Sequence, residues 1–374
     1  MIARDNSLLM VTGAIIALVW ANWHPSSYER ITGPLHFPVN DVAMAFFFGL
    51  AVKEIIEATA PGGALHTLRR AAVPVVAAVG GMAGPAGLYV ALAIAFGRAD
   101  VLRGWAIPCA TDIAFSYLII RLIFHPTHPA VPFLLLLAIA DDALGLVLLA
   151  ALYPGAPLRL LPLIALIALA CAIAWLLRVR GLRSFWPYVL VAGSVAWTGF
   201  YLGGLHPALA LVPVLPFVPH AAHDAGLYVD ADDHAPDPLT DFERWWSTPV
   251  EFVLFFFALT NAGVEVQKTG VVTWIVLLAL LLGKPLGISV ATWLAERAGL
   301  RRPEGLAWRE LLVLGIAAGI GFTVSLFFAT AAFSAGATQD EAKLGAMLSV
   351  SAAVLALAAA QMLGAGRARR REFS

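Results

Sequence analysis

The stretch LAIADDALG, residues 137–145, places two adjacent aspartates inside an apolar run that extends from Val131 to Tyr153. About 20 apolar residues are enough for a helix to cross the hydrocarbon core of a bilayer, so this run is a candidate membrane span. Asp141 would lie roughly 15 Å along such a helix, close to the midplane. An ionised carboxylate there costs roughly 2.5–3.5 kcal/mol on insertion scales. The two aspartates therefore need a partner or a function.

The rest of the 374-residue chain has the same apolar character, with 60% hydrophobic residues and 13% charged residues. These values are typical of an all-α integral membrane protein, here a single transmembrane domain over residues 1–374. The formal net charge of zero argues against a nucleic-acid partner, because no basic field gathers phosphates. The apolar runs predict about twelve spans, at residues 8–22, 41–58, 72–96, 104–124, 131–153, 159–178, 185–203, 205–219, 249–266, 271–296, 307–334 and 341–364.

The basic residues are distributed unevenly between the two sides that these spans define. Most of them fall in the N-terminal segment, the even-numbered loops and the tail RARRRE, so the positive-inside rule predicts that both termini are cytoplasmic. The first span is expected to be retained rather than cleaved as a signal peptide, because its loss would leave an odd number of spans. Cys109 and Cys171 lie inside apolar runs and indicate neither a disulfide nor a thiolate metal site.

Two polar segments lie outside the predicted spans. Residues 220–247 are acidic and contain histidines, but these lack the spacing of a metal site, so the segment is predicted to be a polar linker. The segment YERITGPLHFPVN, residues 28–40, has room for a small hairpin around Thr32-Gly33.

Two of the predicted spans contain Pro or Gly at depths where most membrane helices carry Leu. They are AIPCATDIAF (106–115) in the fourth span and AAGIGFTVSLF (317–327) in the eleventh. Interrupted helices in corresponding places of two halves indicate the binding site of a transporter with inverted repeats. The repeats would be spans three to five, about residues 72–153, and spans ten to twelve, about residues 271–364. Alternatively, the glycines only allow close packing of helices.

The intramembrane charges suggest what such a site would do. Adjacent residues on a helix point about 100° apart, so one of Asp141 and Asp142 can face Lys284 while the other lines a cavity. Interacting carboxylates in a poorly solvated place bind and release protons near neutral pH, and when ionised they are hard ligands for a small cation. Asp112 at the interruption either compensates helix dipoles or binds an ion, and Thr111 either bonds its own backbone or supplies a ligand oxygen.

These segments resemble the NhaA family of sodium/proton antiporters. The motifs that carry the resemblance are ATDIAF (110–115), LAIADDALG (137–145), LTNAGV (259–264), LLGKPLGIS (281–289) and GIGFTVSLF (319–327). The segments WANW, AFFFGLAVK, AAVPVVAAVGGM and GWAIP follow in family order, so the resemblance covers nearly the whole chain. NhaA is one of the examples from which the rule of inverted repeats and broken helices comes, so that architecture is part of what the resemblance implies.

The resemblance implies a secondary transporter and not an enzyme. Twelve helices would form NhaA-type inverted repeats whose fourth and eleventh helices cross at the midplane. The protein would exchange cytoplasmic Na⁺ or Li⁺ for external H⁺ electrogenically, by alternating access and without a cofactor, and so serve sodium and pH homeostasis. It would lie in a bacterial inner membrane, and the 23–40 loop would carry a homodimer contact.

The family pattern also assigns roles to particular residues. Asp142 would be the principal cation ligand, Asp141 the second carboxylate, and Thr111 a further oxygen ligand for Na⁺. Asp141 would pair with Lys284 when no cation is bound, and Asp141, Asp142 and Lys284 would carry the protons. Asp112 and Lys284 would balance the opposed helix ends at the crossing.

The chain departs from the family pattern at its regulatory positions. Ala51 and Ile55 stand in GLAVKEI where the family usually has acids, and Glu54 and Glu57 are candidates to replace them. The pH-responsive acid and histidine before the ninth span are matched only loosely, by Glu243 and Arg244.

Three further residues in or beside the predicted spans need an interpretation. Phe255 stands where the family has proline. Glu251 is interpreted as an interfacial residue rather than a site residue. His206 matches a histidine linked with the family's pH response, or it has a plain role at a helix end.

Two other classes of protein place acids inside a membrane. An intramembrane aspartyl protease would need Tyr-Asp and Gly-x-Gly-Asp on neighbouring helices, whereas this chain has Thr-Asp and Ala-Asp-Asp. A passive cation channel typically selects ions with a ring of acids, whereas a single buried acid pair suits alternating occupancy by a proton or a cation.

Overall fold

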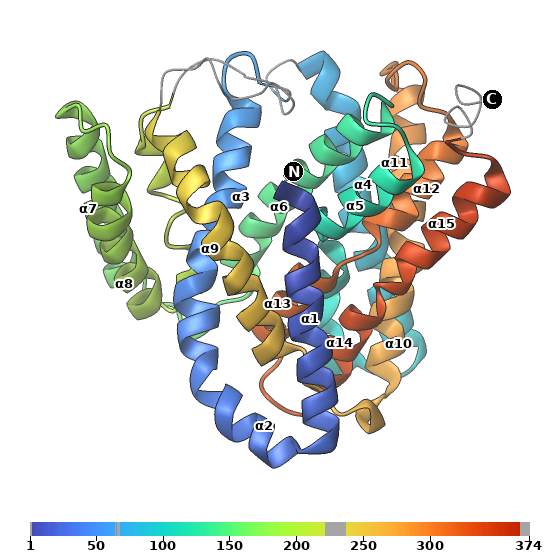
Figure 1. Cartoon of the computed structure of the whole chain (residues 1–374), viewed down its shortest axis with the longest axis horizontal. Helices are drawn as coiled ribbons and strands as arrows, with labels where there is room; N and C mark the ends of the chain where they lie inside the picture. Colours follow the sequence, from blue (N-terminus) through green and yellow to red (C-terminus); the bar gives the residue numbers. More distant parts are fainter. Residues whose placement is uncertain (1, 64, 66–67, 221–236, 367–374) are drawn as a thin grey trace.

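The protein is a bundle of helices in a computed structural model that describes residues 2–63, 65, 68–220 and 237–366. All regular elements within these ranges are helical. Figure 1 places α2 and the start of α10 at its lower edge and the α5–α6 and α11–α12 connections at its upper edge. The α-helices are α1 (Ile2–Trp23), α2 (Pro25–Thr32), α3 (Met44–Thr59), α4 (Leu68–Ala95), α5 (Ile113–Ile123), α6 (Ala130–Leu152), α7 (Leu160–Val179), α8 (Ser194–Gly203), α9 (Pro238–Asn261), α10 (Val271–Leu278), α11 (Lys284–Arg297), α12 (Trp308–Ala318), α13 (Phe322–Ala332), α14 (Ala337–Leu348) and α15 (Ser351–Leu363).

Several of these helices are long and apolar enough to cross a membrane. By length and composition, the described residues contain 5 such helices, at Ala71–Ala95, Ala130–Leu152, Leu160–Val179, Val271–Arg297 and Ala337–Leu363. The number rises to 7 if each of two bent pairs, in which two short helices meet at an angle across a short break, is one span. The first pair joins the 3₁₀ helix η3 (Ala99–Cys109) to α5 at 53°, and the second joins α12 to α13 at 49°. The chain is therefore a multi-pass membrane protein.

The expected eighth span, residues 205–219, is not a continuous helix. It contains only two short 3₁₀ turns, η5 (Pro207–Leu209) and η6 (Leu215–Phe217). Pro207 and Pro216 each begin or enter one of these turns, and a proline lacks the N–H that a continuing helix needs. Fifteen residues with such breaks are also short for a span.

The hairpin expected around Thr32-Gly33 is wrong, because this segment is helical. Pro25 occupies the first turn of α2, a position where its missing N–H costs nothing. The buried Tyr28 hydroxyl donates to the carbonyls of Leu259 and Thr260 at 2.8 and 3.0 Å, which ties α2 to the end of α9. A π-helix, η2 (Phe37–Ala43), then leads directly into α3.

The predicted linker at 220–247 is shorter than expected at its C-terminal end. Residues 221–236 lie outside the described part of the chain, and α9 already begins at Pro238. The Asp237 carboxylate accepts a hydrogen bond of 2.7 Å from the Thr240 N–H, which caps this helix.

Glycines bring α4 and α11 into backbone contact. A Cβ added at Gly80 would lie 2.4 Å from the Gly287 carbonyl oxygen, and one added at Gly84 would lie 2.3 Å from that of Gly283. In membranes, small residues of this kind let two helices approach closely. Because α4 and α11 belong to the two expected repeats, this contact joins the repeats and brings Lys284, at the start of α11, into the centre of the bundle.

Candidate functional site

The two bent pairs meet in the interior of the bundle. The meeting points are the two breaks, between η3 and α5 and between α12 and α13, where the backbone is not helical for a few residues. The Asp112 N–H donates to the Ile320 carbonyl at 2.7 Å, so the breaks touch through their backbones. Helix ends carry unpaired N–H groups or carbonyls, and such ends are tolerated at membrane depth only when protein groups satisfy them. The side chains around the crossing supply these partners.

Asp112 caps the N-termini of α5 and α13, the second helices of the two bent pairs. Its Oδ1 accepts from the Phe115 N–H at 3.2 Å, within its own α5. Its Oδ2 accepts from the Thr323 N–H of α13 at 3.3 Å and from the Thr323 hydroxyl. A buried carboxylate at two helix N-termini compensates the partial positive charge of both. The compensating role that the sequence left open for Asp112 is thus the one that its contacts support.

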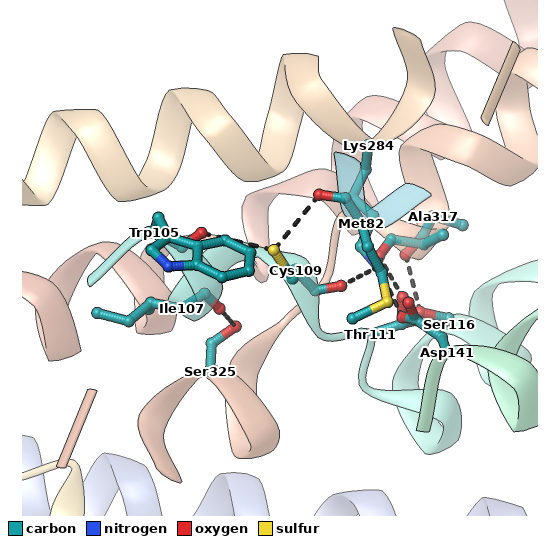
Figure 2. A network of polar contacts seen from close by, with 11 residues as sticks. Met82, Trp105, Ile107, Cys109, Thr111, Ser116, Asp141, Lys284, Ala317 and Ser325 are labelled. Carbon is teal, nitrogen blue, oxygen red and sulfur yellow. Dashed lines mark hydrogen bonds and ion pairs between the residues drawn. The ribbon is translucent and has the colours of Figure 1, made fainter. Parts of the chain in front are cut away.

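The last carbonyls of η3 and α12, the first helices of the two bent pairs, accept hydrogen bonds from different kinds of side chain. The carbonyl of Cys109, at the end of η3, accepts a hydrogen bond from the Lys284 ammonium. The carbonyl of Ala318, at the end of α12, accepts one of 3.2 Å from the Thr111 hydroxyl. Figure 2 shows Lys284 reaching the Cys109 carbonyl and Asp141 together. Because Thr111 donates its proton to the carbonyl, the lone pairs of its oxygen remain able to accept.

Ser349, between α14 and α15, is a cap that the sequence analysis missed. Its hydroxyl accepts from the N–H groups of Gly321 and Phe322 at 3.1 and 3.4 Å, at the start of α13. Its only signal in the sequence is a serine in the apolar twelfth run, and Ser351 carries the same signal, so the sequence does not single out Ser349.

Asp141 and Lys284 form a buried ion pair. The Asp141 Oδ2 lies 2.7 Å from the Lys284 Nζ, and their side chains are 1% and 0% exposed. The other carboxylate oxygen, Asp141 Oδ1, is buried and has no hydrogen-bond partner. An unsatisfied charged oxygen at this depth is costly, so this oxygen is a candidate ligand for an ion.

Asp142, the next residue of α6, lines a small cavity together with Asp141. The cavity has a volume of about 20 Å³, which is enough for about one water molecule or one small ion. Asp141, Asp142 and Ala110 line it, together with residues of α3, α6 and α13. Thr111 is not among the lining residues, although its neighbour Ala110 is. The structure thus brings the two aspartates to one cavity and places the threonine beside it.

Groups of three or more His, Cys, Asp or Glu side chains that could hold a resident metal ion are absent from the part of the chain that the structure describes. Two carboxylates and a neighbouring hydroxyl supply fewer oxygens than a tight cation site, which typically takes six or more. Such a site suits an ion that must both enter and leave.

The regulatory candidates lie at the ends of the bundle. The Lys53 ammonium at the end of α3 contacts the carboxylates of Glu57, at 2.6 Å, and Glu243 of α9. Glu54, on the neighbouring position of α3, is exposed and forms no such pair. Glu251 is half-buried on α9 and does not line the cavity.

His206 has the role at a helix end that the sequence left open, and its link with a pH response stays a prediction. Its Nδ1 accepts from the Ala208 N–H at 3.4 Å, as a cap of η5. The same atom lies 3.9 Å from the Asp41 carboxylate, so a protonated His206 would form an ion pair there.

Comparisons with known proteins agree on one family. The family described as Na⁺/H⁺ antiporter 1 matches residues 2–361. A protein of Geotalea uraniireducens named Na(+)/H(+) antiporter NhaA is 46% identical over 369 residues, with 96% of each chain covered. Na(+)/H(+) antiporter NhaA 1 of Pelobacter propionicus is 44% identical, and Na(+)/H(+) antiporter NhaA of Geobacter sulfurreducens is 41% identical, each with 97% of both chains covered.

Proposed function

Because this chain belongs to the Na⁺/H⁺ antiporter 1 family, a family of transporters and not of enzymes, we propose that one cavity at Asp142 serves both exchanged ions in turn. The resemblance found in the sequence is confirmed, and with it the exchange of Na⁺ for H⁺ across a membrane. The proposal extends this activity to the residues that carry the ions and to the way the protein moves them.

Asp142 is the principal ligand of Na⁺ or Li⁺ in this proposal, and Asp141 and Thr111 complete its oxygen set. The single observation that carries the assignment is the free Asp141 Oδ1, a buried carboxylate oxygen beside a cavity of one-ion size. Thr111 supports it because its proton is engaged by Ala318, which leaves its oxygen free to approach a cation. Carboxylate and hydroxyl oxygens are the ligands that small hard cations prefer.

Exchange follows from competition at these oxygens. Na⁺ arriving from the cytoplasm displaces one proton from Asp142 and one from the Asp141–Lys284 pair, which weakens because the cation now shares the Asp141 carboxylate. The repeats then reorient to open the cavity to the other side, where external protons displace Na⁺. Protons carried by Asp141, Asp142 and Lys284 outnumber the cation, so the cycle is electrogenic. In the cell it serves sodium and pH homeostasis.

The proposed setting is a bacterial inner membrane crossed by about twelve spans with both termini in the cytoplasm. The excess of basic residues in the terminal and even-numbered segments supports this orientation. A homodimer contact through residues 23–40 is supported by three large apolar side chains that this helical segment exposes, Trp23, Ile31 and Phe37. Cross-linking of single cysteines placed in α2 tests the contact, and its absence in membranes would contradict it.

The experiment that tests the proposal measures proton movement in sealed vesicles that contain the purified protein. Addition of Na⁺ to wild-type vesicles with an imposed pH gradient is expected to collapse that gradient, whereas Asp142→Asn abolishes the response. Asp340→Asn is the matched control, because this half-buried carboxylate pairs with Lys268 at 3.2 Å and does not line the cavity. Na⁺-dependent proton flux in Asp142→Asn would contradict the assignment.

The same vesicles separate the two alternative functions. A passive channel would pass Na⁺ without proton counterflow, and a protease would cleave peptides. Calorimetry adds a direct test of competition: Na⁺ binding should release protons and weaken as the pH falls, and uptake that is indifferent to pH would overturn the shared cavity.

A further inference from the structure

Each of the two crossing spans carries one buried serine at the equivalent position. Ser116 is the fourth residue of α5, which begins at Ile113, and Ser325 is the fourth residue of α13, which begins at Phe322. Both serines are 0% exposed. Their positions therefore correspond under the relation between the two expected repeats.

The hydroxyls of these serines make reciprocal bonds between the spans. The Ser116 hydroxyl donates to the Ala317 carbonyl at 2.8 Å, in the last turn of α12. The Ser325 hydroxyl donates to the Ile107 carbonyl at 2.8 Å, in the last turn of η3. Figure 2 shows Ser325 beside Ile107 and Ser116 beside Ala317. α5 is thus bonded to α12, and α13 is bonded to η3.

The hydroxyls of Ser194 and Thr198 in α8 behave differently from those of Ser116 and Ser325. A serine or threonine within a helix usually donates to the carbonyl four residues earlier in its own helix. The Ser194 hydroxyl does so to Leu190 at 2.6 Å, and the Thr198 hydroxyl does so to Ser194 at 2.9 Å. Ser116 and Ser325 instead reach across to another span, so their bonds constrain how the two spans sit together.

The Ser116 bond is adjacent to the one that holds Thr111. Its acceptor, Ala317, precedes Ala318, whose carbonyl accepts from the Thr111 hydroxyl. Any shift of the α12 end relative to α5 would therefore move Thr111 relative to the cavity. Ser325 fixes the same crossing from its other side, through η3.

We propose that Ser116 and Ser325 are positioning residues, a reciprocal hydroxyl pair that holds the two broken spans in one register so that the crossing moves as one body during exchange. This inference rests on the exchange site proposed above, and it adds two residues that touch neither ion. The pair keeps Thr111 and Asp112 in place beside the aspartates while the surrounding helices rearrange. Its loss is expected to affect cation affinity more than turnover, because the carboxylates themselves are unchanged.

The test compares the Na⁺ dependence of exchange in vesicles of Ser116→Ala, Ser325→Ala and the double variant. A net hydrogen bond of this kind corresponds to about a fivefold change, so each single variant should raise the KM for Na⁺ about fivefold while Vmax changes less than about twofold. The double variant should raise KM by less than the product of the two single effects, because both bonds hold one register. Threonine at either position, which restores the hydroxyl, should bring KM back toward that of the wild type.

Ser194→Ala is the control, since its hydroxyl bonds only within its own helix, and its KM should not change. If an alanine variant is not recovered in membranes, the corresponding cysteine variant, similar in size but a weak donor, takes its place with the same expected shift. Alanine variants with lower thermal stability but an unchanged KM would overturn the inference. So would a KM increase of equal size in Ser194→Ala. Absence of Na⁺-dependent proton flux in the wild type would instead contradict the proposed function itself.

Discussion

The two broken spans have the same geometry and different chemistry. The η3–α5 pair bends by 53° and the α12–α13 pair by 49°, and each has a serine at the same helical position. The first break reads Ala110-Thr111-Asp112, with a hydroxyl and a carboxylate, whereas the second reads Gly319-Ile320-Gly321 and has no polar side chain. The bend alone therefore does not define the proposed ion site, because only one of the two breaks carries polar side chains.

The glycines of the second break, Gly319-Ile320-Gly321, let it lie close to the first break, Ala110-Thr111-Asp112. A Cβ added at Gly321 would lie 2.2 Å from the Ser325 hydroxyl oxygen and 3.2 Å from the Ala110 carbonyl oxygen. The second pair thus contributes close approach, and Thr111 and Asp112 of the first pair supply part of the hydrogen bonds at its backbone ends. Four substitutions test this difference between the two breaks, and they follow in order of decreasing expected effect.

Lys284→Ala should have the largest effect on stability. It leaves the Asp141 carboxylate and the Cys109 carbonyl without their cationic partner, and loss of one member of a buried pair typically costs about 3–5 kcal/mol. Thermal unfolding in detergent measures the loss. The double variant Asp141→Asn/Lys284→Met removes both charges and should recover most of it. A Lys284→Ala protein as stable as the wild type would refute this account of the charged side of the crossing.

Asp112→Ala should cost about 2 kcal/mol, since it removes the shared cap of α5 and α13 and orphans the N–H groups of Phe115 and Thr323. Asp112→Asn keeps an acceptor oxygen and should lose less. The same unfolding measurement compares the two. If the alanine and asparagine variants lose equal stability, the carboxylate does not act through these hydrogen bonds.

Thr111→Val compared with Ile320→Val tests the difference between the spans directly, because both residues precede the N-cap of the second helix of a bent pair. Thr111→Val should weaken Na⁺ binding about fivefold and cost about 1 kcal/mol, whereas Ile320→Val should leave Na⁺ binding unchanged. Thr111→Ser, which retains the oxygen, is the control. The Na⁺ dependence of exchange in vesicles provides the measurement, and similar KM values in both valine variants would remove the distinction.

His128→Gln should have the smallest effect, at a contact between the far ends of the two spans. The His128 Nε2 lies 3.7 Å from the Glu310 carboxylate at the start of α12. Burial lowers the pKa of His128 below its usual 6.5, although Glu310 partly opposes this. The folded protein therefore binds a proton at this residue less readily than the unfolded chain, so stability is lost as the pH falls below about 6.5.

His128→Gln should flatten that loss by less than about 1 kcal/mol, measured as unfolding between about pH 7 and pH 5. At pH 7 the variant should lose a small part of its stability, because the His128 Nδ1 accepts from the Ala130 N–H at 3.2 Å and the ring stacks on Phe124. A steeper acid loss in the variant would mean that protonated His128 stabilises the fold through Glu310, which is the opposite of the expected sign.

Much of the site could be predicted from the sequence because charge inside a membrane is rare and expensive. Asp141, Asp142 and Lys284 stand out against apolar neighbours, and the angle between adjacent helical residues shows that the aspartates must face different ways. The structure pairs Asp141 with Lys284 and lets both aspartates line the cavity. Which aspartate faces which way depends on how α6 is rotated against α4 and α11, and a local pattern does not contain that rotation.

The missed features share a cause. Ser116, Ser325 and Ser349 are small polar residues that a membrane helix normally satisfies within itself, so their bonds to other elements are invisible in the sequence. The helical α2 was missed because Thr32-Gly33 is a common turn signal, whereas the Tyr28 contact with α9 that favours the helix joins residues more than 200 positions apart.

A multi-pass membrane antiporter with acids at its centre could be predicted from the sequence, because hydropathy, buried charge and family motifs are local properties of the chain. The contacts between the two breaks, with Thr111 and Asp112 in one and closely packed glycines in the other, come from the tertiary structure. Hydrogen bonds and ion pairs at the crossing depend on helices being brought within about 3 Å of one another, and that distance is set by packing across the whole bundle.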